Sequence, residues 1–124
     1  MPRGKAKLTN SEREILETMW EYGESITATN LAKVSTSKTW KTSSVHLLIN
    51  SLLNKDYIEV VGFEKTTKNY ARKFQPVLPK TEFILTEILD AFNNSTGELF
   101  DSLIAMSSKE ELISAKAKIE EKLK

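Results

Sequence analysis

The sequence predicts a mainly α-helical fold that carries one small β-hairpin. Apolar residues recur at helical spacing in six stretches of the chain. Two short segments, residues 57–61 and 70–74, are instead rich in the β-branched and aromatic residues that favour strands. The polar segment 62–69 lies between them, so we expect the two strands to pair antiparallel. Pro76 and Pro79 close this section, because proline cannot donate to a strand ladder.

The first two helices are marked by the residues at which they begin. Thr9 and Glu12 form a capping-box pattern, in which the Thr9 hydroxyl accepts from the Glu12 amide and the Glu12 side chain reaches back. Gly23 is expected to end this first helix. A second, shorter helix is expected to begin after Thr27 as its N-cap.

The third helix separates apolar from polar side chains. One side carries an apolar stripe at the spacing of a buried helix face, namely Val45, Leu48, Ile49, Leu52 and Leu53. The far side carries small polar groups, one imidazole and one leucine, with almost no charge: Ser43, His46, Leu47, Asn50 and Asn54. Residues 54–56 are expected to stop the helix.

Three helices followed by a two-stranded hairpin is the order of a winged helix, a variant of the helix-turn-helix. In that arrangement the third helix lies in the major groove of DNA and the hairpin tip, residues 62–69, forms the wing. Serine and asparagine can hydrogen-bond to base edges, and leucine can touch a thymine methyl, whereas cations mostly bind phosphates. The residues that fit these roles are Ser43, Ser44, Leu47 and Asn50 on the helix, and Lys65, Lys68, Arg72 and Lys73 on the wing and its strand.

The composition changes after Pro79, and we expect a winged-helix DNA-binding domain over residues 1–79 and a helical dimerisation domain over residues 80–124. The expected dimer core consists of apolar residues that so short a chain cannot bury by itself: Leu85, Ile88, Leu89, Phe92, Leu99, Phe100, Leu103 and Ile104. A self-contained helical hairpin is the alternative. Ser107 or Ser108 is expected to cap the last helix.

Charge and composition narrow the class of function. The net charge is only +1, but residues 1–80 hold 13 basic and 8 acidic residues, a net of +5, and the remainder has a net of −4. A basic front half suits a polyanion such as DNA, although chance unevenness gives the same pattern. The 124 residues include no Cys and a single His, with no glycine-rich phosphate loop, so we expect no catalytic residue, no metal and no cofactor. Neither a membrane span nor a signal peptide is evident, and a cytoplasmic protein is expected.

Three segments of the chain together resemble the BlaI/MecI penicillinase repressors. In "LTNSEREILETMW" the family's Glu, two aliphatic residues and closing Trp correspond to Glu14, Ile15, Leu16 and Trp20. "WKTSSVHLLINSLLNKDYI" is similar to the family's third helix, from Trp40 through a Ser/Thr-rich start to a "KGhI"-like exit at residues 55–58. "KFQPVLPKTEF" is similar to the strand exit. The match extends over residues 8–83, and beyond that it depends on helix order and on "FDSLI".

The resemblance implies a homodimeric repressor that binds an inverted-repeat DNA operator and controls β-lactamase-type or related resistance and stress genes. It places the base-reading region on Lys41, Thr42, Ser43, Ser44 and His46. Family members often carry a basic residue where this chain has Ser43, His46 and Ser51. The penicillinase repressors are inactivated by cleavage of an Asn-Phe bond, and this chain has no such dipeptide; Met106-Ser107 is the aligned pair. Without Cys it also lacks the thiolates with which related copper-responsive repressors bind Cu(I).

Several residues admit a structural as well as a functional role. Trp20 and Trp40 are expected to fill the core rather than to stack on bases. His46 points either to DNA or to water, and a lone His cannot form a triad or anchor a metal. The basic tail that includes Arg3 and Lys5 either follows DNA or is unstructured. For the whole chain, the alternative to a repressor is a winged-helix protein-interaction module that lacks specific DNA binding.

Overall fold

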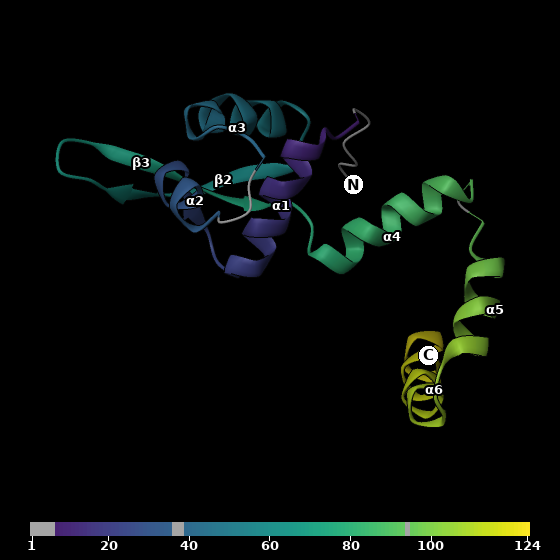
Figure 1. The fold of residues 1–124 in the computed structure, drawn as a ribbon. Coiled ribbons are helices and arrows are strands. Elements are labelled where there is room, and N and C mark those ends of the chain that lie inside the picture. Colours follow the sequence, from purple (N-terminus) through teal and green to yellow (C-terminus); the bar gives the residue numbers. More distant parts are fainter. Residues whose placement is uncertain (1–6, 36–38, 94) are drawn as a thin grey trace. The chain divides into compact units, whose positions relative to one another are not determined.

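The computed structural model describes residues 7–35, 39–93 and 95–124, and it divides into two compact units, Met1–Ile84 and Leu85–Lys124. The predicted mainly α-helical fold with a winged helix at its N-terminal side is confirmed (Figure 1). The elements follow in the order α1 (Asn10–Tyr22), β1 (Ile26–Thr27), α2 (Ala28–Val34), a 3-10 turn η1 (Thr42–Ser44), α3 (Val45–Asn54), β2 (Ile58–Lys65), β3 (Tyr70–Pro76), α4 (Lys80–Ala91), α5 (Gly97–Met106) and α6 (Lys109–Leu123).

The helix boundaries agree with the capping residues in the sequence. Thr9 Oγ1 accepts from the Glu12 amide at 3.2 Å, and Glu12 Oε1 accepts from the Thr9 amide at 2.8 Å, so the predicted capping box is present. Gly23 ends α1 with φ 82°, a left-handed conformation that favours glycine. Thr27 caps α2, and Ser108 forms a second capping box at α6.

The β-sheet differs from the predicted two-stranded hairpin in two ways. β1 pairs antiparallel with β3, which gives a three-stranded sheet in the order β1-β3-β2. A strand of two residues has no alternation by which a sequence could reveal it. In addition, β2 continues past Gly62 to Lys65, so the wing tip is residues 66–69 rather than 62–69. Three charged or aromatic residues after Gly62 still fit a solvent-exposed strand, and the glycine did not end it.

Among the residues that the structure describes, the hydrophobic core lies in the first unit. It combines α1, β1, α2, α3, the inner ends of β2 and β3, and the first turn of α4, and its members are Ile15, Leu16, Met19, Ile26, Ala28, Leu31, Trp40, Val45, Ile49, Leu52, Ile58, Phe74 and Phe83. The apolar stripe predicted for the third helix therefore contributes Val45, Ile49 and Leu52 to the core, and Leu48 and Leu53 pack against it. Trp40 is buried, as predicted, whereas Trp20 is partly buried and its Nε1 donates to the Leu78 carbonyl at 3.0 Å.

The second unit contains the end of α4, together with α5 and α6. Among its described residues, 85–93 and 95–124, none is buried within the single chain. Apolar side chains such as Phe100, Leu103 and Ile104 are more than half exposed. The described residues of this unit therefore form no buried core within the single chain.

Candidate nucleic-acid interface

The third helix is entered through a short, anchored segment. Trp40 is 6% exposed and fixes the chain just before η1. The amide and hydroxyl of Thr39 both donate to the Glu14 carboxylate, at 2.9 and 2.8 Å. From Lys41, which has an extended backbone, the chain turns through η1 directly into α3. The helical segment that begins at Thr42 is therefore tied to α1 at its start.

The far side of this segment faces solvent. Ser43, His46 and Asn50 are exposed, and none of them contributes to the core. Leu47, between them, has 73% of its surface exposed, which is high for a leucine in a helix. Lys41 and Thr42 are also exposed, and Ser44 is half-buried. The structure thus brings the helix residues of the predicted base-reading set together on one accessible surface.

A third side of α3 is occupied by a buried polar cluster. Ser51 Oγ donates to Glu12 Oε2, and Lys55 Nζ donates to Glu12 Oε1 at 2.8 Å. Lys55 Nζ also donates to the Lys7 carbonyl at 2.9 Å. Glu12 itself is 1% exposed. We call the contacts among Glu12, Ser51, Lys55 and the Thr9 amide the Glu12 clasp; it joins the first turn of α1 to the last turns of α3.

The Glu12 clasp favours the ionised carboxylate. Burial alone raises the pKa of Glu12, but hydrogen bonds from Lys55, Ser51 and the Thr9 amide, together with the Lys55 charge, lower it further than burial raises it. The pKa of this carboxyl therefore lies below its ordinary value of 4.5. Because its hydroxyl is bonded to Glu12, Ser51 is not part of the exposed side of α3 that carries His46 and Asn50.

The wing carries the predicted cations outside the core. Its tip is closed by Thr66 and Asn69, whose backbone and hydroxyl groups exchange hydrogen bonds of 2.7 to 3.1 Å. Lys65 ends β2 and Lys68 lies in the turn, and both are exposed. Arg72 on β3 is exposed as well, with its guanidinium carbon 5.2 Å from the centroid of the Phe74 ring. These three cations, which were predicted to bind phosphates, lie on the hairpin, whereas Lys41, of the predicted base-reading region, lies at the start of η1.

Three further points concern the basic tail, metal binding and membrane spans. Arg3 and Lys5 of the basic tail lie outside the residues that the structure describes. Within the described residues, no group of three His, Asp or Glu side chains is arranged to hold a metal ion. The described helices also include none long and apolar enough to cross a membrane.

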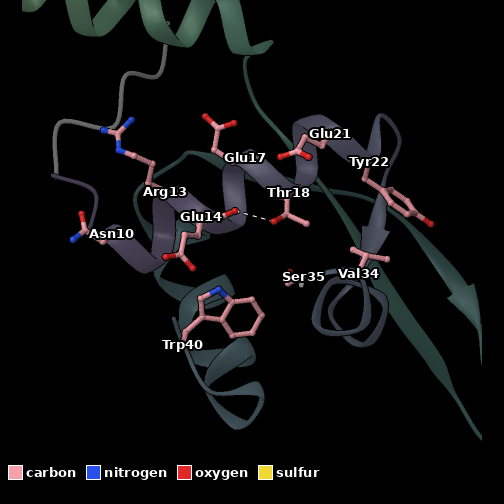
Figure 2. Close-up of a pocket in the computed structure, with 10 residues that line it drawn as sticks. All are labelled: Asn10, Arg13, Glu14, Glu17, Thr18, Glu21, Tyr22, Val34, Ser35 and Trp40. Atoms are coloured by element: carbon pink, nitrogen blue, oxygen red, sulfur yellow. Dashed lines mark hydrogen bonds between the residues drawn. The ribbon is translucent and has the colours of Figure 1, made fainter. Parts of the chain in front are cut away.

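A hollow of about 710 Å³ lies beside α1, and Figure 2 shows the residues that line it. Its lining includes Glu14, Glu17 and Glu21, three carboxylates on successive turns of α1, and also Trp40 (Figure 2). Glu14 is bound to Thr39 and Glu17 pairs with Lys80 at 2.9 Å, so two of these groups have structural partners. Arg13 also lines the hollow, but three carboxylates against one guanidinium leave its lining net negative and unsuited to phosphates.

Sequence reasoning missed two features of this region. The Glu12 clasp joins residues 39 and 43 positions apart, and the capping-box pattern revealed only the local half of its contacts. The exposed aromatic residues Phe63 and Tyr70 on the wing were also not predicted as site residues; each is 65% exposed. For these aromatic residues, the only available signal in the sequence was a phenylalanine next to Gly62 in an otherwise polar segment.

Comparisons with known proteins give one family match and several structural likenesses. The family model described as penicillinase repressor matches residues 8–124. The crystal structure of MepR, a transcription regulator of the Staphylococcus aureus multidrug efflux pump MepA, is 18% identical over 94% of this chain and 78% of that one, with a TM-score of 0.45. The adhesin competence repressor AdcR from Streptococcus pyogenes is 21% identical over 91% and 76%, with a TM-score of 0.44. A mutant of S. aureus MepR bound to an oligodeoxyribonucleotide is 18% identical over 94% and 78%, with a TM-score of 0.47. Comparison with curated protein sequences gives no significant match.

Proposed function

The chain belongs to the penicillinase repressor family of winged-helix, DNA-binding transcription regulators, and from this premise we propose that it represses transcription as a homodimer bound to an inverted-repeat operator. The match over residues 8–124 confirms the resemblance found in the sequence and extends it through the second unit. In the proposed complex α3 lies in the major groove and the wing binds the adjacent backbone.

The observation that best supports this proposal is the exposed side of η1 and α3. On this side, short polar groups and Leu47 are exposed to solvent, while the core and the Glu12 clasp occupy the other two sides of the helix. Base edges are recognised by hydrogen bonds and methyl contacts of this kind. We assign Ser43, His46, Leu47 and Asn50 to base contacts, and Lys41, Thr42 and Ser44 to the entry of the helix into the groove.

Affinity for phosphates is assigned to the wing. Lys65, Lys68 and Arg72 are exposed cations on a projecting hairpin, and the exposed side of α3 has no Lys, Arg, Asp or Glu residue. Binding to phosphates releases counterions and needs charge rather than shape. In this proposal sequence reading and phosphate binding are thus divided between two elements.

Dimerisation is assigned to the second unit. Of the eight predicted dimer residues, Leu85, Phe92, Phe100, Leu103 and Ile104 are 40–58% exposed in the single chain, and Ile88, Leu89 and Leu99 are half-buried. α6 adds Ile113, Ile119 and Leu123, which are 53–80% exposed. Apolar residues in such number are a common mark of an interface between subunits. We therefore extend the proposed interface to α6.

Site selection from a pool of random duplexes tests the proposal. The wild-type protein is expected to enrich an inverted repeat whose half-sites are one helical turn apart or a multiple of it. It should bind that duplex at least about a thousandfold more tightly than random DNA at ~150 mM salt. Enrichment of no sequence, with binding that stays non-specific, contradicts the proposal and favours the protein-interaction module.

A further inference from the structure

The outer part of the wing has one face that is both aromatic and cationic. Along β3, Tyr70, Arg72 and Phe74 point to the same side of the sheet, because successive side chains alternate. Phe74 is 2% exposed and belongs to the core, so this is the side that the helices cover at the inner end of the sheet. The position of the Arg72 guanidinium over the Phe74 ring, 5.2 Å from its centroid, agrees with this placement.

A bulge in β2 brings two further residues to the same face. Val60 pairs with Phe74, but the next pair is Gly62 with Lys73, so Val61 is an extra residue. In an unbroken strand Phe63 and Lys65 would point away from the core side, since Ile58 and Val60 point toward it. The extra residue reverses the alternation, and bulges often re-aim side chains in this way.

As a result Phe63 lies opposite Arg72, and Lys65 lies opposite Tyr70. Residues directly opposite in an antiparallel pair share a face. Phe63 and Tyr70 are diagonal neighbours on that face, a spacing that aromatic side chains can bridge. We call these four residues the aromatic–cationic wing face. The hairpin extends past α2 and α3 (Figure 1), and Phe63 and Tyr70 are each 65% exposed.

The charge on the two faces of the outer wing differs. The aromatic–cationic wing face has Lys65 and Arg72 and no carboxylate. The opposite face has Glu64 paired with Ala71, and Gly62 paired with Lys73, so its charges balance. An exposed aromatic pair alone could bind many kinds of partner. A pair flanked only by cations favours a partner that is a polyanion and also has apolar surfaces.

We propose that this face binds duplex DNA, with Phe63 and Tyr70 packed on the deoxyribose and base edges of the minor groove while Lys65 and Arg72 contact the flanking phosphates. This inference rests on the proposed function and adds apolar contacts to the proposed binding of DNA by the wing. A hairpin beside a helix seated in the major groove meets the sugar-phosphate ridge and then the minor groove, because the two grooves alternate along the duplex. Apolar side chains at base steps are an established means of minor-groove binding.

The test measures the affinity of wing variants for the duplex that the wild type selects from the random pool, over a series of KCl concentrations. The double variant Phe63→Ala/Tyr70→Ala is expected to lose about tenfold or more in affinity. The slope of log affinity against log salt should stay unchanged, because no charge is removed. Lys65→Ala is instead expected to reduce that slope. Tyr22→Ala, an exposed aromatic on α1 (38% exposed), is the matched control and should bind as the wild type does.

The outcomes separate this inference from the proposed function. If the wild type selects a site and the double variant binds that site equally well, the inference is overturned and the repressor proposal stands. If the wild type selects no site, the repressor proposal itself fails. Fluorescence of Trp20 and Trp40 reports whether each variant is folded; should the double variant be unfolded, Phe63→Ala alone must lose about threefold in affinity for the inference to survive.

Discussion

Replacing Glu12 by Gln is expected to lower the stability of the first unit by about 2 kcal/mol at pH 7, in the range for hydrogen bonds to charged groups. Gln can still accept from the Thr9 amide, so the helix cap is largely kept. What it loses is the negative charge that faces Lys55, whose side chain is 21% exposed against 2% for Glu12. Glu12→Ala removes all the contacts of the Glu12 clasp, and we expect a larger cost of about 3–5 kcal/mol.

The pH dependence of this difference follows from the lowered pKa of Glu12. The unfolded chain, with the carboxyl near its ordinary value of 4.5, binds a proton at a higher pH than the folded chain does. The stabilisation is therefore fully present above about pH 4.5 and is lost as the pH falls through the lower folded-state pKa. The gap between wild type and Glu12→Gln should narrow over that acid range.

Urea unfolding followed by tryptophan fluorescence measures this effect in the correct unit, since both tryptophans, Trp20 and Trp40, lie in it. A cost of about 2 kcal/mol lowers the urea midpoint by about 1–2 M. Glu17→Gln is the control: its pair with Lys80 is exposed on both sides, and we expect a change below about 0.5 kcal/mol. A Glu12→Gln protein as stable as the wild type at pH 7, or a gap that persists unchanged in acid, would refute the reasoning.

Four further outcomes are expected. Asn50→Ala should reduce the preference for the selected site over random DNA by about tenfold in competition binding, whereas Asn10→Ala on α1 should not. Salt titration should give a slope of about −5 for a dimer with three phosphate-binding cations per protomer, and Lys68→Ala should make it shallower by about 2; an unchanged slope means that the wing does not touch phosphates. Phe100→Asp should convert dimers to monomers in sedimentation while the tryptophan unfolding midpoint stays constant; a monomeric wild type would end the dimer proposal. Asp56, at φ 63°, occupies the glycine position of the "KGhI"-like exit, so Asp56→Val should cost about 1–2 kcal/mol by urea unfolding and Asp56→Gly should not.

Local signals predicted what local contacts determine. The capping box at Thr9, the glycine at the end of α1 and the cap at Ser108 each depend on residues three or four positions apart, and each was correct. The apolar period of the third helix likewise identified its buried side, because burial against any core imposes that period. The fold class followed from these signals in sequence order, whereas the family was found from the resemblance of three segments.

The features that were missed depend on pairing between distant segments. β1 is a strand only because β3 lies beside it, and two residues carry no period of their own. The bulge at Val61 appears only in the register with β3, and without it the alternation of β2 assigns Phe63 to the wrong face. The partners of Glu12 on α3 are equally invisible in the local sequence. The base and phosphate contacts assigned to individual residues remain predictions.

The Glu12 clasp and the uncharged side of α3 depend on each other physically. A long cation reaches a phosphate from many helix orientations, because its side chain is flexible, whereas serine and asparagine extend only a few ångströms and must be aimed. α3 is held on one side by the core and on another by Ser51 and Lys55, which bind a carboxylate that is itself fixed in the cap of α1. Turning the helix by one residue, about 100°, would break the Glu12 clasp and expose the apolar stripe together. Only one orientation is left, and it presents Ser43 and Asn50 outward; a helix that uses short neutral groups to recognise bases needs this constraint more than one that relies on arginine.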